Sequence, residues 1–265
     1  MDVTSLAFRT DLALRRIAGA QVDDRGDHLV VRSPDNPLFW WGNFLLLAAV
    51  PPAAEVDAWL GRFAAEFPDA KHVAIGMDGV AGTTDDVAAF TDRGFSADAS
   101  TVLTATEVRE PARPNRDADC RAFRSDDDWA QSIEVQLRSY NDGTPAGLQR
   151  EFVTARIAAN RRLVEAGHGA WFGAFLDGRL VAQLGIVRAD GDLARYQTVE
   201  TDPRFRRRGL AGTLVHRAAQ YGLDELGAST LVMVADPDAE AIRIYRALGF
   251  DDTEVQLQVE RAPGR

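Results

Sequence analysis

A short run of arginines and small residues in the second half of the chain could bind a phosphate-rich ligand. Arg204 and residues 206–208 are arginines, and Gly209, Ala211 and Gly212 follow them closely. Small residues where a helix begins allow a phosphate to approach backbone N–H groups that have no partner within the helix. The whole chain has a formal net charge of −10. Positive charge concentrated in one turn of an acidic protein indicates a polyphosphate ligand rather than nucleic acid.

Hydrophobic periodicity and turn residues predict the elements that would position this run. Strands are expected over residues 170–176, 179–187, 193–201 and 230–235, and helices over 125–137, 148–165, 210–226 and 239–248. Ser125 is a suitable N-cap, and the Asp177-Gly178 pair is typical of a two-residue hairpin. A run of hairpin strands followed by a β-loop-α-β unit predicts a mixed sheet with helices on its faces.

The chain is expected to contain two domains. Residues 109–119 are polar, carry two prolines and show no apolar periodicity, which is typical of a linker. Each half ends in a similar way, because Phe90 in the first half and Tyr245 in the second precede a Gly-Phe pair by the same spacing. This repetition suggests an internal duplication, with domains at residues 1–110 and 119–265.

The first half carries an aromatic segment whose role stays open at this level. Residues 39–45 fit a buried strand pair, and residues 55–67 predict a helix that turns Trp59 and Phe63 inward. Trp40 and Trp41 could form a platform for a ligand. A packed core or an interface between the halves is the favoured interpretation of such a cluster.

Composition excludes several classes of protein. With 46% hydrophobic and 26% charged residues among 265, the chain is typical of a globular protein, and its pI near 4.9 argues against a nucleic-acid partner. Cys120 is the single cysteine and the four histidines are scattered, so no metal is expected. The apolar run at 39–50 is too short to span a membrane, and no export leader opens the sequence. A cytoplasmic monomer or homodimer without a membrane partner is expected.

Two motifs resemble those of the GNAT superfamily of N-acetyltransferases. The residues R-R-R-G-L-A at 206–211 match its R/Q-x-x-G-x-G/A motif, and D-A-E-A-I-R-I-Y-R-A-L-G-F at 238–250 resembles its N-x-x-A-x-x-L-Y-x-x-x-G-F signature. Both stand in the right order within residues 120–261. The resemblance implies an α/β (α+β) fold of two tandem GNAT-like domains. Each would have a mixed, mostly antiparallel twisted sheet with helices on both faces.

The resemblance implies acetyl-CoA as the acyl donor. The loop residues Arg206, Arg207, Arg208, Gly209, Ala211 and Gly212 would hold its pyrophosphate. Backbone groups of Val199 and Thr201 would bind the pantetheine arm and the acyl carbonyl, in a gap between strands 193–201 and 230–235. Asp238 stands where the family usually has Asn, and a carboxylate cannot donate the amide hydrogen bond to the arm.

The chemistry implied is direct attack of an amine on a thioester. Tyr245 stands at the family's general-acid position, where a phenol can protonate the departing sulfur. The alternative role for this side chain is packing in the core. Glu200 could act as the base through water, or be a solvated strand residue or a cation contact. The first domain has Phe90 where the pattern places Tyr245, and it lacks the arginine motif. It is therefore expected to be degenerate and non-catalytic.

The acceptor is the least defined partner. Tyr140, Asn141 and Asp142 lie between the first two helices of the second half, where the family commonly forms its acceptor wall, or they form a plain surface loop. Acidic residues suit a cationic amine such as an aminoglycoside, a polyamine, an amino acid or a peptide N-terminus. The favoured function is acetylation of a small primary amine. The alternatives are a non-catalytic CoA-binding regulatory module and a protein or peptide N-acetyltransferase.

Overall fold

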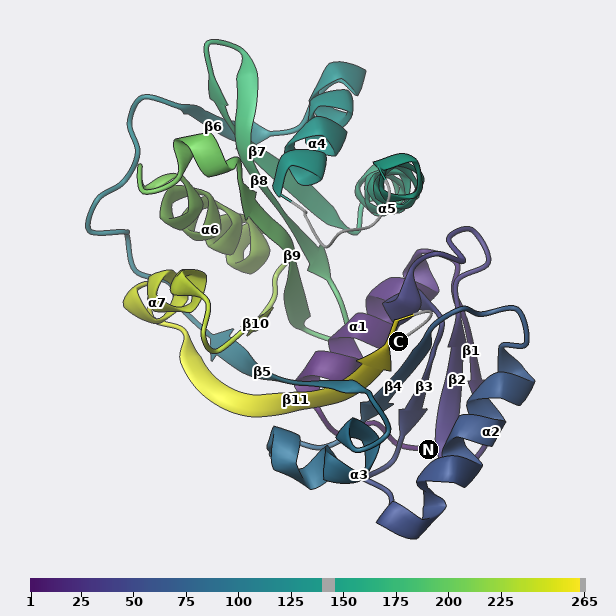
Figure 1. The fold of residues 1–265 in the computed structure, drawn as a ribbon. Helices are drawn as coiled ribbons and strands as arrows, with labels where there is room; N and C mark the ends of the chain where they lie inside the picture. The colour runs from purple at the N-terminus through teal and green to yellow at the C-terminus, as the bar shows by residue number, and fades with distance from the viewer. Residues whose placement is uncertain (140–145, 263–265) are drawn as a thin grey trace. The chain divides into compact units, whose positions relative to one another are not determined.

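The computed structural model describes residues 1–139 and 146–262 and forms two compact units (Figure 1). Among the described residues, the first unit comprises Met1–Val102, Val234–Pro237 and residues 253–262, and the second comprises Leu103–Met233 and Asp238–Asp252. The division at residues 1–110 and 119–265 stays a prediction. Residues 253–262 make most of their contacts with the first unit, although they come last in the sequence. No helix in the described ranges is long and apolar enough to cross a membrane.

The first unit is built on five strands in the order β1-β2-β3-β4-β11. Pairing is antiparallel except between β3 and β4, which run parallel. The strands are β1 (Gln21–Asp24), β2 (His28–Arg32), β3 (Phe44–Leu47), β4 (Val73–Met77) and β11 (Asp251–Arg261). Its helices are α1 (Leu6–Ile17), α2 (Val56–Glu66) and α3 (Ala88–Thr91). Strand β5 (Ser96–Ala105) runs from this unit into the second.

Both faces of the central strands are covered, which explains why β2, β3 and β4 are mostly apolar rather than alternating. Phe44 and Leu46 of β3 pack on one face with Phe8 of α1. Leu45 and Leu47 point to the other face, among residues of α2 and α3. Trp59 and Phe63 belong to that second cluster, as predicted from the helical spacing.

The prediction of a buried strand pair over residues 39–45 is wrong. Trp40–Gly42 is a 3-10 turn, and β3 begins only at Phe44. The side chain of Asn43 causes this, because its amide donates to the carbonyl of Phe39 at 2.9 Å and satisfies the backbone locally. Trp40 stacks on His72 with ring centroids 5.5 Å apart, and Trp41 donates its indole N–H to Glu260 at 2.7 Å. Both indoles therefore serve packing within the first unit.

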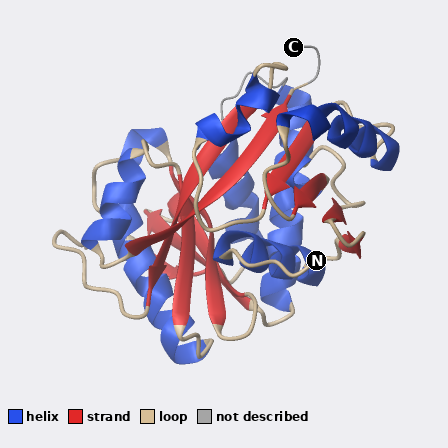
Figure 2. Ribbon diagram, turned by 90° about the horizontal axis from the view of Figure 1, so that it is seen from below, coloured by secondary structure: helices blue, strands red, loops and turns tan. Residues whose placement is uncertain are grey.

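The second unit has five strands in the order β6-β7-β8-β9-β10, antiparallel except for the parallel pair β9/β10. Its strands are β6 (Asp119–Ala122), β7 (Gly169–Leu176), β8 (Arg179–Arg188), β9 (Leu193–Thr201) and β10 (Thr230–Ala235). Its helices are α4 (Asp126–Ser139), α5 (Ala146–Glu165), α6 (Leu210–Gln220) and α7 (Glu240–Ala247). Helices cover both faces of the strands (Figures 1 and 2). The α/β (α+β) class with a mixed, mostly antiparallel sheet is confirmed.

Most predicted elements of the second unit lie within two residues of their observed bounds. The hairpin between β7 and β8 turns at Asp177 and Gly178, which have φ of 50° and 76° as a primed turn requires. The helix predicted over residues 210–226 ends at Gln220 and continues as a single π-helical turn, Tyr221–Glu225. Gly222 lies in this turn, and a Cβ there would lie 2.7 Å from the side chain of Ile186, so the close approach to β8 requires glycine.

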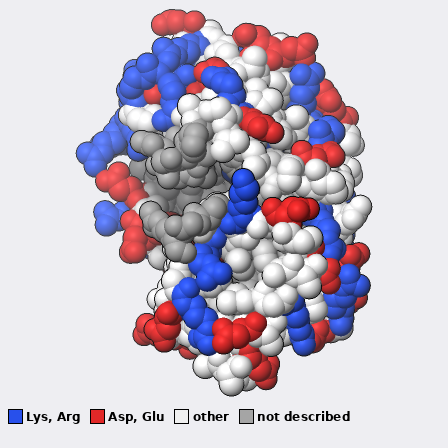
Figure 3. Space-filling view, turned by 45° about the vertical axis from the view of Figure 1, so that its right-hand side comes forward, with Lys and Arg blue, Asp and Glu red and all other residues white. Residues whose placement is uncertain are grey.

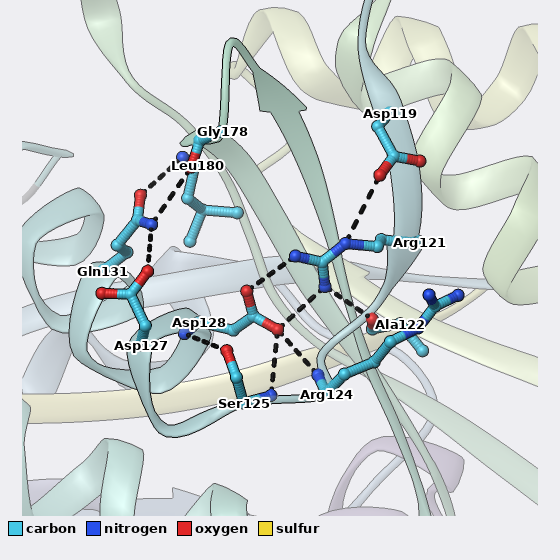
Figure 4. Close-up of polar contacts among 10 residues, drawn as sticks. All are labelled: Asp119, Arg121, Ala122, Arg124, Ser125, Asp127, Asp128, Gln131, Gly178 and Leu180. Carbon is cyan, nitrogen blue, oxygen red and sulfur yellow. Dashed lines mark hydrogen bonds and ion pairs between the residues drawn. The ribbon is translucent and has the colours of Figure 1, made fainter.

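A buried ion pair fixes where α4 begins (Figure 4). Asp128 is 2% exposed, and both of its carboxylate oxygens accept hydrogen bonds of 2.8 Å from the guanidinium of Arg121 on β6. The Arg121 guanidinium holds the pKa of Asp128 at about 2. The hydroxyl of Ser125 accepts from the Asp128 N–H at 3.2 Å, which confirms the predicted N-cap. One turn later, the side-chain amide of Gln131 donates to the Gly178 carbonyl and accepts from the Leu180 N–H, which ties α4 to the β7–β8 hairpin.

The two halves share one local feature in three dimensions. In each, an N–H donates back across a left-handed glycine: from Phe95 to the carbonyl of Phe90 at 3.2 Å, and from Phe250 to that of Tyr245 at 3.1 Å. Gly94 and Gly249 have φ of 79° and 102°. The matching Gly-Phe motifs therefore end their helices in the same way.

Candidate active site

A bulge in β9 breaks the regular pairing beside the candidate base. Gln183 of β8 pairs with Glu200 and Gly185 pairs with Gln197, so β9 contains one residue more than β8 over this stretch. Thr198, in the bulge, has a left-handed φ of 49°. Neither Thr198 nor Val199 has a partner in the register. A bulge of this kind leaves backbone groups outside the ladder and redirects the side chains that follow.

Glu200 is held by a buried glutamine. The Nε2 of Gln183, whose side chain is fully buried, donates to Glu200 at 3.0 Å. The hydroxyl of Ser132 on α4 donates to the Gln183 Oε1 at 2.5 Å, and the Trp171 indole donates to the same atom at 3.2 Å. Burial raises the pKa of Glu200 above its ordinary value. A carboxyl with a raised pKa is a stronger base once it is ionised.

Glu200→Gln should raise the melting temperature at pH 8 by about 2–4 °C, and by much less at pH 4. The folded chain raises the pKa of Glu200, so it binds that proton more tightly than the unfolded chain does. The stability contributed by this group is therefore lost as the pH rises from the unfolded pKa through the raised folded pKa. Glutamine carries no charge and still accepts from Gln183. Circular dichroism melts at both pH values measure the difference; a variant destabilised more at pH 8 than at pH 4 contradicts it.

Tyr245 lies on the buried face of α7. Its side chain is 4% exposed, and burial raises its pKa to about 12. The nearby Tyr196 of β9 is also buried, and its hydroxyl donates to the Val215 carbonyl at 2.9 Å. Tyr245 is therefore protonated throughout the physiological pH range, as a proton donor must be before it acts.

Strands β9 and β10 separate along their length, as predicted. They pair only over Thr230–Val232 of β10, opposite Leu193–Arg195 of β9. The remainder of β9 therefore has a ladder partner on one side only, namely β8. Unpaired backbone N–H and C=O groups along such an edge can bind an extended ligand as a strand would bind.

The arginine run divides into two parts in the structure. Arg204 contributes to a structural ion pair, because its Nη2 lies 2.7 Å from Asp202, whose side chain is fully buried and also bonded by Arg138 at 2.8 Å. The sequence-based picture is corrected here, because Arg204 is held in an ion pair with Asp202, which also pairs with Arg138 and Arg179. Residues 206–208 are exposed, and Arg207 bonds Glu240 at 3.0 Å.

Acidic and basic side chains are interspersed over the face shown in Figure 3. This face has no broad positive potential, so an anion would have to be bound by specific groups at one place. The backbone at the start of α6 provides such a group. Arg207 and Gly209 have left-handed φ values of 62° and 75°, and α6 begins directly after them without a side-chain cap. The N–H groups of its first turn, which includes Ala211 and Gly212, have no helical partner and can bind an anion.

The predicted linker packs against this loop. The Nδ2 of Asn115 donates to the Arg208 carbonyl at 2.8 Å, and the Asn115 N–H donates to the Thr213 hydroxyl at 2.8 Å. A Cβ on Gly209 would lie 2.4 Å from the Arg113 carbonyl oxygen. The segment has no regular structure, as expected, but it supports the loop from outside. Only Gly fits at position 209, for both steric and conformational reasons.

The other predicted residues lie as follows. Thr201 pairs with Ala182 of β8, and its carbonyl accepts from the Nε of Arg206 at 3.4 Å. Asp238 is exposed in the turn before α7. Tyr140, Asn141 and Asp142 fall outside the described residues. In the two described ranges, no three His, Cys, Asp or Glu side chains gather to form a metal site.

Sequence reasoning missed the residues that support the site. Gln183 and Asn115 were not singled out, and neither were Gln136 and Arg156, which lie near Glu200. Gln183 had a detectable signal, as a lone amide within the apolar strand L-V-A-Q-L-G-I-V. The others occupy ordinary polar positions in helices or a loop, and nothing in their spacing connects them with Glu200 or Gly209.

Residues 133–250 match the family described as the acetyltransferase (GNAT) family. The chain contains a GNAT acetyltransferase domain. Members of this family are acyltransferases that use acetyl-CoA. The matched residues carry the β9 bulge, the loop before α6 and Tyr245, so the GNAT domain comprises the geometry described above. No protein with a curated description matches the sequence.

Solved structures resemble the whole chain in fold. A GCN5-related N-acetyltransferase from Kribbella flavida is 17% identical with a TM-score of 0.68, covering 98% of this chain and 95% of its own. A conserved protein of unknown function from Staphylococcus epidermidis is 12% identical, with a TM-score of 0.69 and coverage of 93% and 95%. A tandem GNAT protein from the clavulanic acid biosynthesis pathway is 13% identical, with a TM-score of 0.54 and coverage of 95% and 88%. At these identities the likeness concerns the fold alone.

Proposed function

We propose that this chain is an N-acyltransferase that moves the acetyl group of acetyl-CoA to the primary amine of a small molecule. The start of α6 is the observation that carries the proposal. Two left-handed residues, Arg207 and Gly209, present the N–H groups of an uncapped helix. The pyrophosphate of CoA would bind these groups, and the exposed residues 206–208 would add charge-assisted contacts to its oxygens.

The pantetheine arm would lie along the part of β9 that β10 leaves unpaired. Val199 has no partner in the register with β8, and its backbone groups would bind the extended arm. Thr201 would contribute at the end of the strand. Asp238, exposed before α7, would lie near the arm and contact it without an amide donor.

Each proton in the reaction has a candidate side chain. The acceptor nitrogen forms a bond to the thioester carbon, and the C–S bond breaks with its electron pair passing to sulfur. Glu200, ionised, takes the proton that the ammonium of the acceptor must lose, directly or through water. Tyr245, neutral because burial raises its pKa to about 12, gives its proton to the sulfur. The nitrogen loses its second proton as the amide forms, and that proton restores the Tyr245 hydroxyl, so the net proton released is the one that Glu200 passes to solvent.

We assign this chemistry to the second unit. Phe90 occupies the place in the first unit that Tyr245 occupies in the second, with the same backbone bond across a left-handed glycine. A phenyl ring has no proton to give. The first unit would then have a non-catalytic role.

Release of CoA in the presence of a broad amine panel tests the function directly. The panel should include polyamines, aminoglycosides, amino acids and short peptides, with free thiol followed by a chromogenic reagent and the acetylated product identified by mass. We expect thiol release and a product 42 Da heavier, from the mass of the transferred acetyl group, with at least one small amine. Tight CoA binding without release from any member would contradict the proposal and favour a regulatory module. Release with peptides alone would favour a peptide acetyltransferase.

A further inference from the structure

Three arginines from separate parts of the second unit, Arg138, Arg179 and Arg204, converge on one buried carboxylate and are called the arginine group below. Arg204 bonds both oxygens of Asp202, from Nε to Oδ1 at 3.0 Å and from Nη2 to Oδ2 at 2.7 Å. The Nε of Arg138, near the end of α4, donates to Oδ2 at 2.8 Å, and the Nη2 of Arg179, where β8 begins, lies 3.7 Å from the same oxygen. One arginine would balance the charge of Asp202, so the group contains two more than the carboxylate requires.

The arginine group and Asp202 together carry two excess positive charges. The hydrogen bonds from Arg204 hold the pKa of Asp202 well below its usual range, so this side chain contributes one negative charge. Glu134 also lies near Arg138, but it is paired with Arg150 at 2.8 Å and leaves the balance unchanged. Like charges held close together repel one another, and a bound anion relieves that repulsion. The three arginine side chains are 32–56% exposed, so they can also donate to a ligand that arrives from solvent.

The arginine group adjoins the loop proposed for the CoA pyrophosphate. Arg204 and Phe205 directly precede residues 206–208 in the chain. The half-buried ring of Phe205 contacts a guanidinium from each side of this boundary: the guanidinium carbons of Arg179 and Arg208 lie 5.7 Å and 5.9 Å from its centroid. The arginine group and the start of α6 are therefore neighbouring places at which an anion can bind.

We propose that the arginine group binds the 3′-phosphate on the ribose of CoA while the start of α6 binds the pyrophosphate. This proposal rests on the acyltransferase function and specifies its donor as one that carries a terminal phosphomonoester. Such a group has a charge of about −1.5 to −2 at pH 7, which matches the two excess positive charges. Its oxygens can accept paired hydrogen bonds from planar guanidiniums. One ribose separates the two phosphate groups of CoA, so binding both requires neighbouring sites on the protein.

A matched pair of ligands tests the proposal. CoA and 3′-dephospho-CoA differ only in the phosphate that the arginine group would bind. The affinity of the full chain for each is measured by calorimetric titration under the same conditions. We expect CoA to bind about tenfold or more tightly than 3′-dephospho-CoA, as charge-assisted hydrogen bonds to one phosphate would give.

Arg179→Met should lower the affinity for CoA by about fivefold or more and leave the affinity for 3′-dephospho-CoA unchanged. Arg179 is the member of the group to replace, because its contact with Asp202 is the longest and the carboxylate keeps its bonds to Arg138 and Arg204. Arg179→Lys retains the charge and should keep part of the preference. Arg161→Met is the matched control: it removes an arginine of α5 that is paired with acidic side chains, and it should leave the preference intact.

Equal affinities for CoA and 3′-dephospho-CoA, no binding of either, or an unchanged preference in Arg179→Met would each overturn the proposal. An equal fall in affinity for both ligands in Arg179→Met would also overturn it, because a structural role would then explain the loss. Acetyl transfer to an amine together with equal affinities would overturn this inference alone and leave the acyltransferase function standing. A preference for CoA that Arg179→Met removes, without transfer to any amine, would support this inference and contradict the acyltransferase function.

Discussion

Tyr245→Phe is expected to lower the rate of CoA release by about 10²- to 10⁴-fold while leaving the fold and the affinity for CoA unchanged. General acid catalysis contributes an effect of this size. The hydroxyl removed is the group that would protonate the departing sulfur, whereas the ring that packs α7 is retained. Phe90 already occupies the equivalent place in the first unit, which shows that this helix ending accepts a phenyl ring. Steady-state rates with saturating donor and acceptor measure the loss.

Tyr196→Phe is the matched control. This neighbouring tyrosine is equally buried, and its hydroxyl donates to the Val215 carbonyl. Its loss should cost about 1 kcal/mol of stability with little change in rate, because one structural hydrogen bond disappears. Full activity in Tyr245→Phe, or the same fall in rate in both variants, would contradict the assignment of Tyr245 as the acid.

Gly209→Ala is expected to weaken CoA binding by at least about tenfold and to lower the melting temperature. The new Cβ would lie 2.4 Å from the Arg113 carbonyl, and an alanine at a φ of 75° adds about 1–2 kcal/mol of backbone strain. The loop or the segment around Asn115 must shift, and the N–H groups at the start of α6 then lose their arrangement. Calorimetric titration with CoA and thermal melts measure the two effects.

Gly191→Ala separates strain from steric clash. Gly191 has a φ of 60°, and a Cβ there meets nothing within 4 Å. This variant should lose comparable stability through strain alone and keep the CoA affinity of the unaltered chain. Equal affinities in Gly209→Ala and Gly191→Ala would show that the contact with Arg113 is unimportant for the loop.

Local signals were reliable where the backbone itself imposed the requirement. The hairpin at Asp177 and Gly178, the cap at Ser125 and the ending at Gly249 each follow from one or two residues whose conformational preferences dominate. The strand prediction for residues 39–45 was wrong because no single residue there imposes a backbone conformation typical of a strand. Burial of aromatic residues does not require a strand, and here the side chain of Asn43 favours the turn through bonds to the backbone.

Apart from β6, which was not predicted, the order of elements in the second unit could be read from the amino-acid sequence, as could the loop of residues 206–212 and the candidate acid and base. Each depends on neighbouring residues or on a motif of fixed spacing. Tertiary structure alone decided which charges remain available and what surrounds Glu200. Arg204 is held in an ion pair by Asp202, which also pairs with Arg138 from α4. Glu200 receives Gln183, Gln136 and Arg156 from three other elements. Such contacts join residues tens of positions apart, and only the packing of helices on the sheet brings them together.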